Sequence, residues 1–238
     1  MGVVTEIARR WSTRGLRSAL RNVAAEAQIM RRHRAGLRDA RKFGEARGLR
    51  IQLGSGGQPK PGWVNVDLTA DADLQLDLRE RLPFRDDAAA IVYAEHVLEH
   101  LVYPGEVRHL LSEVHRILEP GGVVKLVVPD AGRALEAYGL RERDFFAARR
   151  VRSYLTEEPP TPMHIINYIF RQDGQHRYAY DEETLAQVLQ LAGFVNARPR
   201  PFDPEIDSER RRGVNSLYME AEKPTSARSP APSPPSPC

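Results

Sequence analysis

The sequence predicts an α/β fold built on one mostly parallel sheet, and three observations lead to that prediction. From residue 49 onward, short apolar runs alternate with segments of helical apolar spacing, as in strand–helix–strand units. Residues 123–128 are apolar except for Lys125, as expected of a strand covered on both faces. The stretch Gly54–Gly57 directly follows an apolar run, a layout found at the carboxyl edge of such sheets.

Composition describes one domain of ordinary size with appendages. The 238 residues are 41% hydrophobic and 28% charged, which fits a globular protein with a full core. No run approaches about eighteen apolar residues and the N-terminus lacks an apolar signal region, so we expect neither a membrane span nor secretion. The single cysteine, Cys238, excludes an internal disulfide framework and a cysteine-based zinc site. We therefore expect a cytoplasmic protein.

Residues 1–48 are predicted to form a basic helical extension. Residues 1–50 carry thirteen Lys/Arg and four Asp/Glu, whereas the remainder carries twenty-two and twenty-eight, so the positive charge is concentrated at the N-terminus. Apolar residues recur there at helical spacing: Leu16, Leu20, Val23, Ala27, Met30 and Leu37. This stripe predicts a helix that packs on the domain or pairs with a second subunit. The alternative is contact with an anionic surface, either lipid headgroups or nucleic acid.

The elements of the domain follow in order from residue 49. The apolar runs predict strands at Ile51–Leu53, Trp63–Val66, Leu74–Leu76, Ile91–Ala94 and Val123–Val128, with two more around Ala197–Arg200 and Ser216–Glu222. Helical spacing predicts a helix over Pro104–Leu118, which Pro120 and the glycines after it bring to an end. Asp181 can cap a later helix that ends at Gly193.

Two further segments complete the division of the chain. Residues 131–177 follow a central strand and are rich in aromatic residues and histidines around a proline-rich break at Glu158–Pro162, which predicts a lid over a ligand. Residues 224–238 are rich in Pro and Ser and are predicted to be disordered. The extension 1–48, the domain 49–223 and this tail are therefore expected to be distinct.

A glycine turn followed by a carboxylate opens the candidate site. Gly54 and Gly56 allow backbone conformations that are closed to other residues, and they let main-chain N–H groups approach a ligand. By itself this signal is equally that of a tight turn that ends a strand. Asp67 ends the next strand and can accept hydrogen bonds from both hydroxyls of a ribose.

Two later segments extend the same site. Asp77 and Leu78 follow the third strand, where a carboxylate and a backbone N–H can read an adenine edge. Residues 93–101 follow the fourth strand and contain Glu95 and His96. Because ligands of open α/β sheets bind beyond the carboxyl ends of the strands, we expect all four segments to meet there. The sequence therefore predicts a site for an adenosine-containing ligand.

The series LGSG, GWVNVDL, DLRERLPF, AEHVLEHL and ILEPGGVVKLVVPD resembles the class I S-adenosylmethionine-dependent methyltransferases. It is most similar to a small bacterial, type 11-like group with a Gly-Trp-x-Asn-Val-Asp second strand, often encoded among surface-polysaccharide and glycosyltransferase functions. The resemblance spans about Leu49–Glu222 and implies a Rossmann-like fold, with a seven-stranded sheet and helices on both faces. It also implies cofactor-binding roles for Gly54, Ser55 and Gly56 at the methionine, Asp67 with Leu68 at the ribose, Asp77 and Leu78 at the adenine, and Glu95 with His96 near the sulfonium.

The glycine turn departs from the family pattern in two ways. Position 58 is Gln where a third glycine is usual, and the connection from Gly56 to Asp67 is too short for more than a vestigial first helix. A dinucleotide fingerprint also fails, because Lys60 stands near the position of its last glycine. S-adenosylmethionine has no phosphates, so these departures favour a phosphate-free adenosyl ligand.

Histidines are the candidate catalytic residues. Methyl transfer is an in-line displacement that depends on alignment, and a hydroxyl acceptor also needs a base for its proton. His96 is the best candidate because it follows the strand end directly, and His164 and His176 of the predicted lid could face the acceptor or be ordinary surface histidines. His96 and His100 could form a metal pair with Asp130, but this spacing often arises by chance, so no metal site is predicted.

The sequence thus predicts an S-adenosylmethionine-dependent methyltransferase that acts on a small-molecule or glycan acceptor, chiefly at oxygen. Its N-terminal helix is expected to pair with a second copy or to contact an anionic surface at the inner face of the membrane, and nucleic acid is the weaker partner because no aromatic residues interleave with the arginines. One rival is an RNA or protein methyltransferase that grips its substrate with the basic arm. The other is a non-catalytic methyltransferase-like assembly protein.

Overall fold

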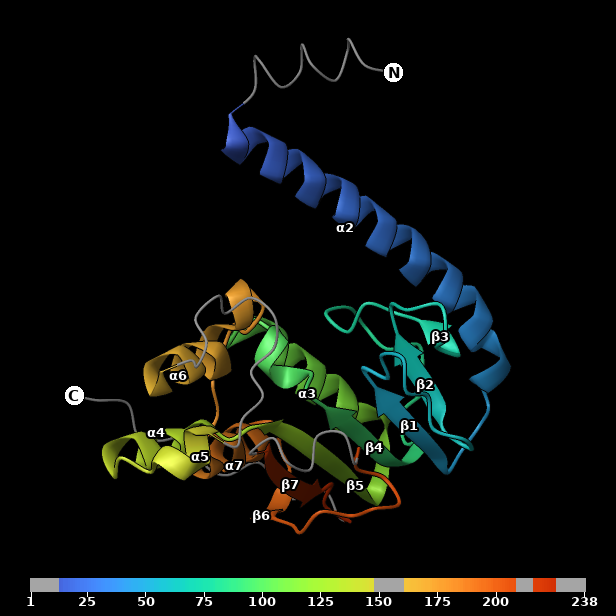
Figure 1. Cartoon of the computed structure of the whole chain (residues 1–238). Coiled ribbons are helices and arrows are strands. Elements are labelled where there is room, and N and C mark those ends of the chain that lie inside the picture. Colours follow the sequence, from blue (N-terminus) through green and yellow to red (C-terminus); the bar gives the residue numbers. More distant parts are fainter. Residues whose placement is uncertain (1–12, 148–160, 209–215, 226–238) are drawn as a thin grey trace, which may run out of the picture.

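The computed structural model describes residues 13–147, 161–208 and 216–225 and contains one seven-stranded sheet (Figure 1). Its strands are β1 (Leu49–Leu53), β2 (Val64–Asp67), β3 (Leu74–Gln75), β4 (Ala89–Glu95), β5 (Leu118–Pro129), β6 (Val195–Pro199) and β7 (Ser216–Glu222). They lie in the order β3-β2-β1-β4-β5-β7-β6, and β7 runs antiparallel to both of its neighbours. The predicted mostly parallel α/β sheet is confirmed.

The centre of the sheet brings together strands that are distant in sequence. Ile51 of β1 pairs with Val64 of β2 on one side and with Val92 of β4 on the other. The chain therefore leaves β1 in one direction and returns to its other side at β4. Such a reversal of strand order opens a crevice at the carboxyl ends of the two strands.

The connection from β1 to β2 contains no helix, as the short spacing predicted. Trp63 at its end packs on the sheet face that carries Tyr93 and Val127, and Ile206 from a distant loop completes this small cluster. An ordinary crossover would place a helix there. Side chains from loops therefore cover part of this face of the sheet.

The main core lies on the other face of the sheet, beneath α3 (Gly105–Ile117) and α7 (Glu182–Leu191). Side chains of β4 alternate between the two faces of the sheet. Val92 and Ala94 point into this core, while Tyr93 between them points to the opposite face. Helix α3 buries an apolar stripe and ends at Ile117, one residue before the predicted end. Each fully buried Leu or Val contributes about 1.5–3 kcal/mol, so this core dominates the stability.

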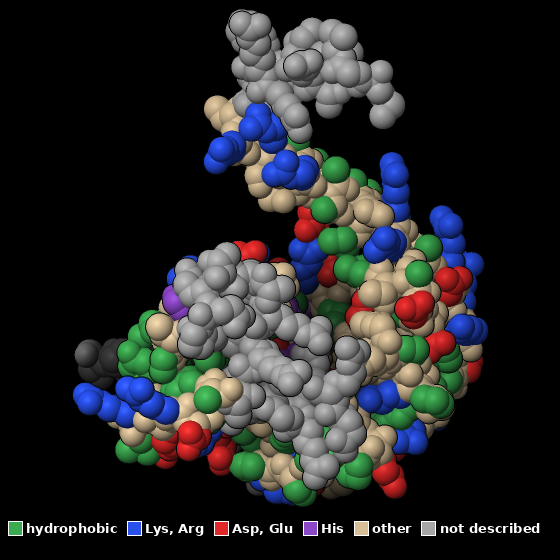
Figure 2. All heavy atoms as spheres, viewed as in Figure 1, with side chains coloured by type: hydrophobic (Ala, Val, Ile, Leu, Met, Phe, Trp, Pro, Cys, Tyr) green, Lys and Arg blue, Asp and Glu red, His purple; other side chains and the backbone are tan. Residues whose placement is uncertain are grey.

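Within the predicted extension, the described residues form α2 (Arg14–Asp39) and the short η1 (Ala40–Phe43). Its C-terminal end packs beside β3, where Gly36 and Ala40 are buried (Figure 1). The N-terminal half extends away from the sheet, and Leu20 and Val23 are 60% and 67% exposed. Basic side chains gather along α2 in Figure 2. No helix among the described residues is long and apolar enough to cross a membrane.

The predicted lid segment contributes α4 (Ala131–Gly139), α5 (Arg143–Ala147), α6 (Pro162–Arg171) and η3 (Gln172–Gly174). These helices share a small core of their own, made by Ala134, Ala137, Phe146, Ile165, Ile166 and Ile169. Most of the predicted proline-rich break, and the predicted disordered tail from residue 226, lie outside the described residues.

Candidate functional site

A cavity of about 360 Å³ lies at the carboxyl ends of the central strands, where the strand order reverses. It is lined by Gly54, Gly56, Asp67, Leu68, Leu76, Asp77, Leu78, Arg79, Glu95, His96, Val97, His100 and Leu101. All the predicted cofactor residues except Ser55 therefore line one cavity, whose size suits a small-molecule ligand. A larger hollow of about 810 Å³ lies against α2, but it lacks the glycine turn and shares only Asp77 and Arg79 with the cavity.

The glycine turn forms one wall of the cavity. Gly54 has a φ of +69°, and a Cβ there would lie 2.2 Å from Cγ2 of Val97, so no side chain fits. Gly56 also has a positive φ, of +53°, but a Cβ there would meet nothing within 4 Å. Ser55 between them is buried, and its Oγ has no hydrogen-bond partner among the described residues. The turn thus leaves open space and an unsatisfied polar atom beside the cavity.

Asp67 ties the end of β2 to this turn. Its Oδ2 accepts a hydrogen bond from the Gly56 N–H at 2.8 Å, and its Oδ1 accepts one from the Thr69 N–H at 2.9 Å. Each carboxylate oxygen can accept a second hydrogen bond. Asp67 is half-buried at the cavity wall, so two neighbouring hydroxyls of a ligand can be bound there.

Asp77 also lines the cavity and is held by Arg79. The guanidinium donates to both carboxylate oxygens of Asp77, and it also bridges to Glu26 of α2 at 2.8 Å. Burial alone would raise the pKa of Asp77, but the hydrogen bonds from Arg79 outweigh it and hold that pKa below its ordinary value. The Asp77 N–H donates to Nδ1 of His33, so α2 contacts this end of the site directly.

His96 stands at the end of β4 in a left-handed backbone conformation, with a φ of +54°. Its Nδ1 donates to Oε1 of Glu99 at 2.8 Å, since a carboxylate can only accept. Its Nε2 then accepts from the Ser216 hydroxyl at 3.3 Å. Glu95, the residue before it, also lines the cavity and has a buried Oε1 with no partner among the described residues.

Glu99 and His100 form η2 (Leu98–His100) with Leu98, and His176 reaches the same place from the end of the predicted lid. One ligand atom from each of these three side chains lies within 4.8 Å of the others. The two imidazole rings are 5.0 Å apart between centroids. Burial lowers the pKa of His176, whose Nδ1 donates to the Ile169 carbonyl at 2.6 Å. His176 is therefore a neutral imidazole at neutral pH.

The remaining predicted residues lie elsewhere. His164 caps its own helix α6, because its Nδ1 accepts from the Thr161 N–H while its N–H donates back to Thr161 Oγ1. Asp130 caps α4 through the Arg133 N–H, and it is not part of the group that Glu99 forms with two histidines. Sequence reasoning did not identify Arg79 or the role of Glu99. The only signal for Glu99 was its place one residue before His100 and three after His96.

The arrangement is chemically asymmetric. One end of the cavity offers an open glycine turn and carboxylates, which fit a ribose and an amine-bearing ligand. The other end offers an imidazole oriented by a carboxylate, which is the form of a general base. The cavity therefore suits an adenosyl cofactor beside an acceptor that loses a proton.

Comparisons with known proteins agree in part with this description. A model of a methyltransferase-domain family matches residues 24–198. None of the curated proteins matches the sequence. A S-adenosylmethionine-dependent methyltransferase from Methanosarcina mazei is 15% identical, with 78% of this chain and 97% of that chain covered and a TM-score of 0.46.

Two longer enzymes are also similar in structure. Phosphoethanolamine N-methyltransferase 2 of Haemonchus contortus is 15% identical, with 80% of this chain covered and a TM-score of 0.44. Human N-acetylserotonin methyltransferase is 16% identical, with 79% of this chain covered and a TM-score of 0.44. This chain spans 52% of the length of each of them.

Proposed function

The chain belongs to the methyltransferase-domain family, and from this premise we propose that it transfers a methyl group from S-adenosylmethionine to a hydroxyl of a glycan or small-molecule acceptor. The cofactor and the reaction class follow from the family. The choice of oxygen rests on one observation, the pairing of His96 with Glu99 at the cavity wall. A hydroxyl loses its proton as it is methylated, and the His96–Glu99 pair would act as the base that accepts this proton.

The cofactor is proposed to lie across the glycine turn. Gly54, Ser55 and Gly56 would hold the methionine portion, and the carboxylate of Asp67 with the following Leu68 would hold the ribose. Asp77 and the Leu78 N–H would bind the adenine, and Glu95 would lie near the sulfonium. Support comes from the open space beside Gly56 and from the unpartnered buried oxygens of Ser55 and Glu95. The carboxylate of the half-buried Glu95 would favour a cationic group.

S-adenosylmethionine, when bound, supplies a methyl group on a positively charged sulfur. The residues of this chain would then align the acceptor oxygen with the methyl carbon and the sulfur. As the new oxygen–carbon bond forms, the sulfur keeps the electron pair of the broken bond, and the hydroxyl proton passes to Nε2 of His96. That nitrogen now shares a long hydrogen bond with Ser216, so an acceptor could take its place. Glu99 would stabilise the imidazolium that results.

The acceptor is proposed to bind on the side of residues 131–177, which would act as a lid. His176 lies on this side, next to His100 at the cavity wall. His164 is the weaker candidate, because its ring is engaged in capping α6. A glycan acceptor would agree with the resemblance to the bacterial group that has a Gly-Trp-x-Asn-Val-Asp second strand.

The extension of residues 1–48 is proposed to pair with a second copy or to contact an anionic, cytoplasmic membrane surface through the half of α2 that extends away from the sheet. Support comes from the exposed apolar stripe and the arginines of α2. Sedimentation distinguishes pairing with a second copy from membrane contact. A Leu20→Glu variant would dissociate a dimer but would leave sedimentation with anionic vesicles largely intact. A monomeric wild type that ignores anionic vesicles would contradict both.

The direct test of the reaction is transfer of a labelled methyl group. Purified chain, methyl-labelled S-adenosylmethionine and separate glycan, RNA and protein fractions would be incubated together. We expect label in the glycan or small-molecule fraction as an alkali-resistant methyl ether. Because His96 would take the proton, His96→Ala should reduce this label by about 10²–10⁴-fold, whereas the exposed His109→Ala should not.

Other outcomes of the same assay identify the rivals. Label in RNA or protein that falls steeply with salt would indicate a methyltransferase that uses its basic arm. No label in any fraction, with a folded protein, would favour the assembly protein without catalysis.

A further inference from the structure

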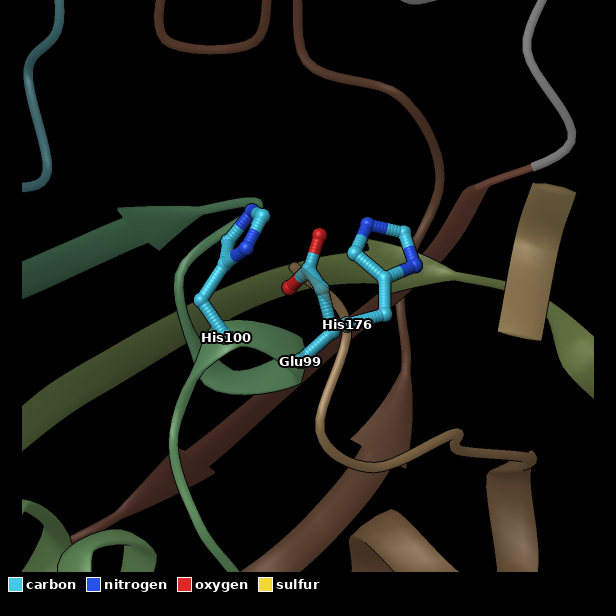
Figure 3. A group of neighbouring side chains, drawn as sticks. All are labelled: Glu99, His100 and His176. Carbon is cyan, nitrogen blue, oxygen red and sulfur yellow. The ribbon is translucent and has the colours of Figure 1, made fainter. Parts of the chain in front are cut away.

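We propose that Glu99, His100 and His176 form a binding site for a divalent first-row transition metal ion, next to the cofactor cavity. The proposal deepens the proposed function and rests on it for its consequence, although the metal site itself can be tested separately. It replaces the expectation from sequence that no metal site is present. Figure 3 shows the Glu99 carboxylate lying between the two imidazole rings.

The backbone of two distant segments is tied together at this point. The N–H groups of Arg177 and Tyr178 both donate to the Glu99 carbonyl, at 2.6 and 3.3 Å. This anchors the chain after η3 against η2. His176 is therefore held beside His100, although 75 residues separate the two in the sequence. The group depends on the fold and is not a local feature of one helix.

The hydrogen bonds of the two histidines leave Nε2 as the nitrogen without a hydrogen on each ring. Nδ1 of His176 lies 2.6 Å from the Ile169 carbonyl, and Nδ1 of His100 lies 3.2 Å from the Gln175 carbonyl. A carbonyl oxygen only accepts, so both Nδ1 atoms carry the hydrogen and both Nε2 atoms carry a lone pair. Metal-binding histidines are oriented in this way, with one ring N–H donated to a carbonyl or carboxylate.

Glu99 supplies the third ligand atom. Its side chain is 1% exposed, its Oε1 accepts from His96, and its Oε2 has no hydrogen-bond partner among the described residues. A buried, unpaired carboxylate oxygen is costly. The lone pairs of this oxygen and of the two Nε2 atoms would repel one another at close range unless a cation lies between them.

The size and chemistry of the group select the kind of ion. Ligand atoms at about 2.0–2.2 Å from one tetrahedral ion lie about 3.3–3.6 Å apart. The atoms here lie within 4.8 Å of one another, so the half-exposed His100 ring would move toward the other two side chains to close the site. Two imidazoles and one carboxylate suit zinc, manganese, cobalt or iron, and they leave coordination positions open.

An open position at this place has a consequence for the reaction. His100 lines the cofactor cavity as well, so the ion would lie at the end of the cavity where the acceptor is expected. A hydroxyl bound to a divalent ion loses its proton more easily, and a second hydroxyl on the acceptor could bind the same ion. The inference therefore points to acceptors with neighbouring hydroxyl groups.

The test is a metal titration of the full-length chain without an affinity tag. Metal-free protein would be titrated with Zn²⁺ by calorimetry and with Co²⁺ by visible absorption, since the Co²⁺ bands report the ligands. We expect one ion per chain. Glu99→Gln, which keeps the side-chain volume, and His176→Ala should each weaken binding at least about tenfold, whereas the exposed His109→Ala should bind like wild type.

Two results would overturn the proposal: no saturable binding of one ion, or equal affinity in Glu99→Gln, His176→Ala and wild type. Thermal unfolding of each variant checks that it is folded. If His176→Ala does not fold, the result for Glu99→Gln alone decides the test. S-adenosylhomocysteine binding is measured on the same samples. Cofactor binding without metal binding removes this proposal alone, and metal binding without cofactor binding removes the proposed function alone.

Discussion

Asp67 gives the sharpest single-residue test of the proposed cofactor site. Its two oxygens already accept hydrogen bonds from the N–H groups of Gly56 and Thr69, which fix the carboxylate at the cavity wall. A carboxylate held by backbone donors needs no reorganisation when hydroxyls bind. Both oxygens keep a free lone pair, which is the requirement for two ribose hydroxyls.

We predict that Asp67→Ala loses about 1.5–3 kcal/mol of S-adenosylhomocysteine affinity, the range for hydrogen bonds to a charged group. Calorimetric titration measures this loss of S-adenosylhomocysteine affinity. Asp71→Ala is the matched control, because Asp71 is an exposed aspartate of the same loop and should bind like wild type. An unchanged dissociation constant in a folded Asp67→Ala variant would mean that the ribose lies elsewhere.

Single residues also show how far sequence reasoning reaches. Gly54, Gly56 and Asp67 could be predicted because each stands at or shortly after the end of a strand, and strand ends converge in a parallel sheet. His176 was predicted only as a candidate on a lid. Its place beside His100 depends on the contact between the segment after η3 and η2, and no local pattern encodes that contact.

Among the elements, α2 is the one whose docking most needs a physical explanation. Gly36 lies in the last turn of this helix, where a Cβ would be 2.3 Å from the backbone oxygen of Gln75. The helix therefore contacts β3 through a position that only glycine allows. Arg32 donates to the Leu68 carbonyl from the same helix, and Glu26 reaches Arg79. These contacts bring α2 to the part of the cavity wall formed by Asp77 and Arg79.

We predict that Gly36→Ala lowers the free energy of unfolding by up to about 2 kcal/mol. Alanine favours an isolated helix by about 0.8–1.0 kcal/mol over glycine, but the clash with a backbone atom costs more, about 1–3 kcal/mol in overpacked sites. Urea unfolding measures the difference, and hydrogen exchange shows whether α2 is the part that opens. Gly15→Ala in the same helix meets its nearest atom at 3.9 Å and should be neutral or slightly stabilising.

A stabilising effect of Gly36→Ala would show that α2 does not dock in this way. The sequence pattern predicted α2 as a helix because apolar residues recur at its period. It named packing on the domain as one option but did not predict where α2 docks, because the apolar stripe is exposed over its first half and the contact is made by a glycine. Periodicity identifies a helix face, whereas close approach of two backbones depends on the rest of the fold.

At the scale of the whole molecule, the sheet explains why the site is where it is. The order β3-β2-β1-β4-β5-β7-β6 reverses direction between β1 and β4, and the cavity opens at their carboxyl ends. The apolar runs predicted β1 to β5, since buried strands are short and apolar on both faces, whereas β6 is largely exposed and β7 alternates between half-buried and buried residues. The position of α2 and the meeting of His176 with η2 came only from the three-dimensional fold.

The central claim is that this cavity binds S-adenosylmethionine. Its most direct test is a calorimetric titration of the wild-type chain with S-adenosylhomocysteine, with ATP and a nicotinamide dinucleotide as controls. We predict one S-adenosylhomocysteine bound per chain and no comparable binding of either phosphate-bearing control. A folded protein that does not bind S-adenosylhomocysteine, or that prefers a control, would contradict it.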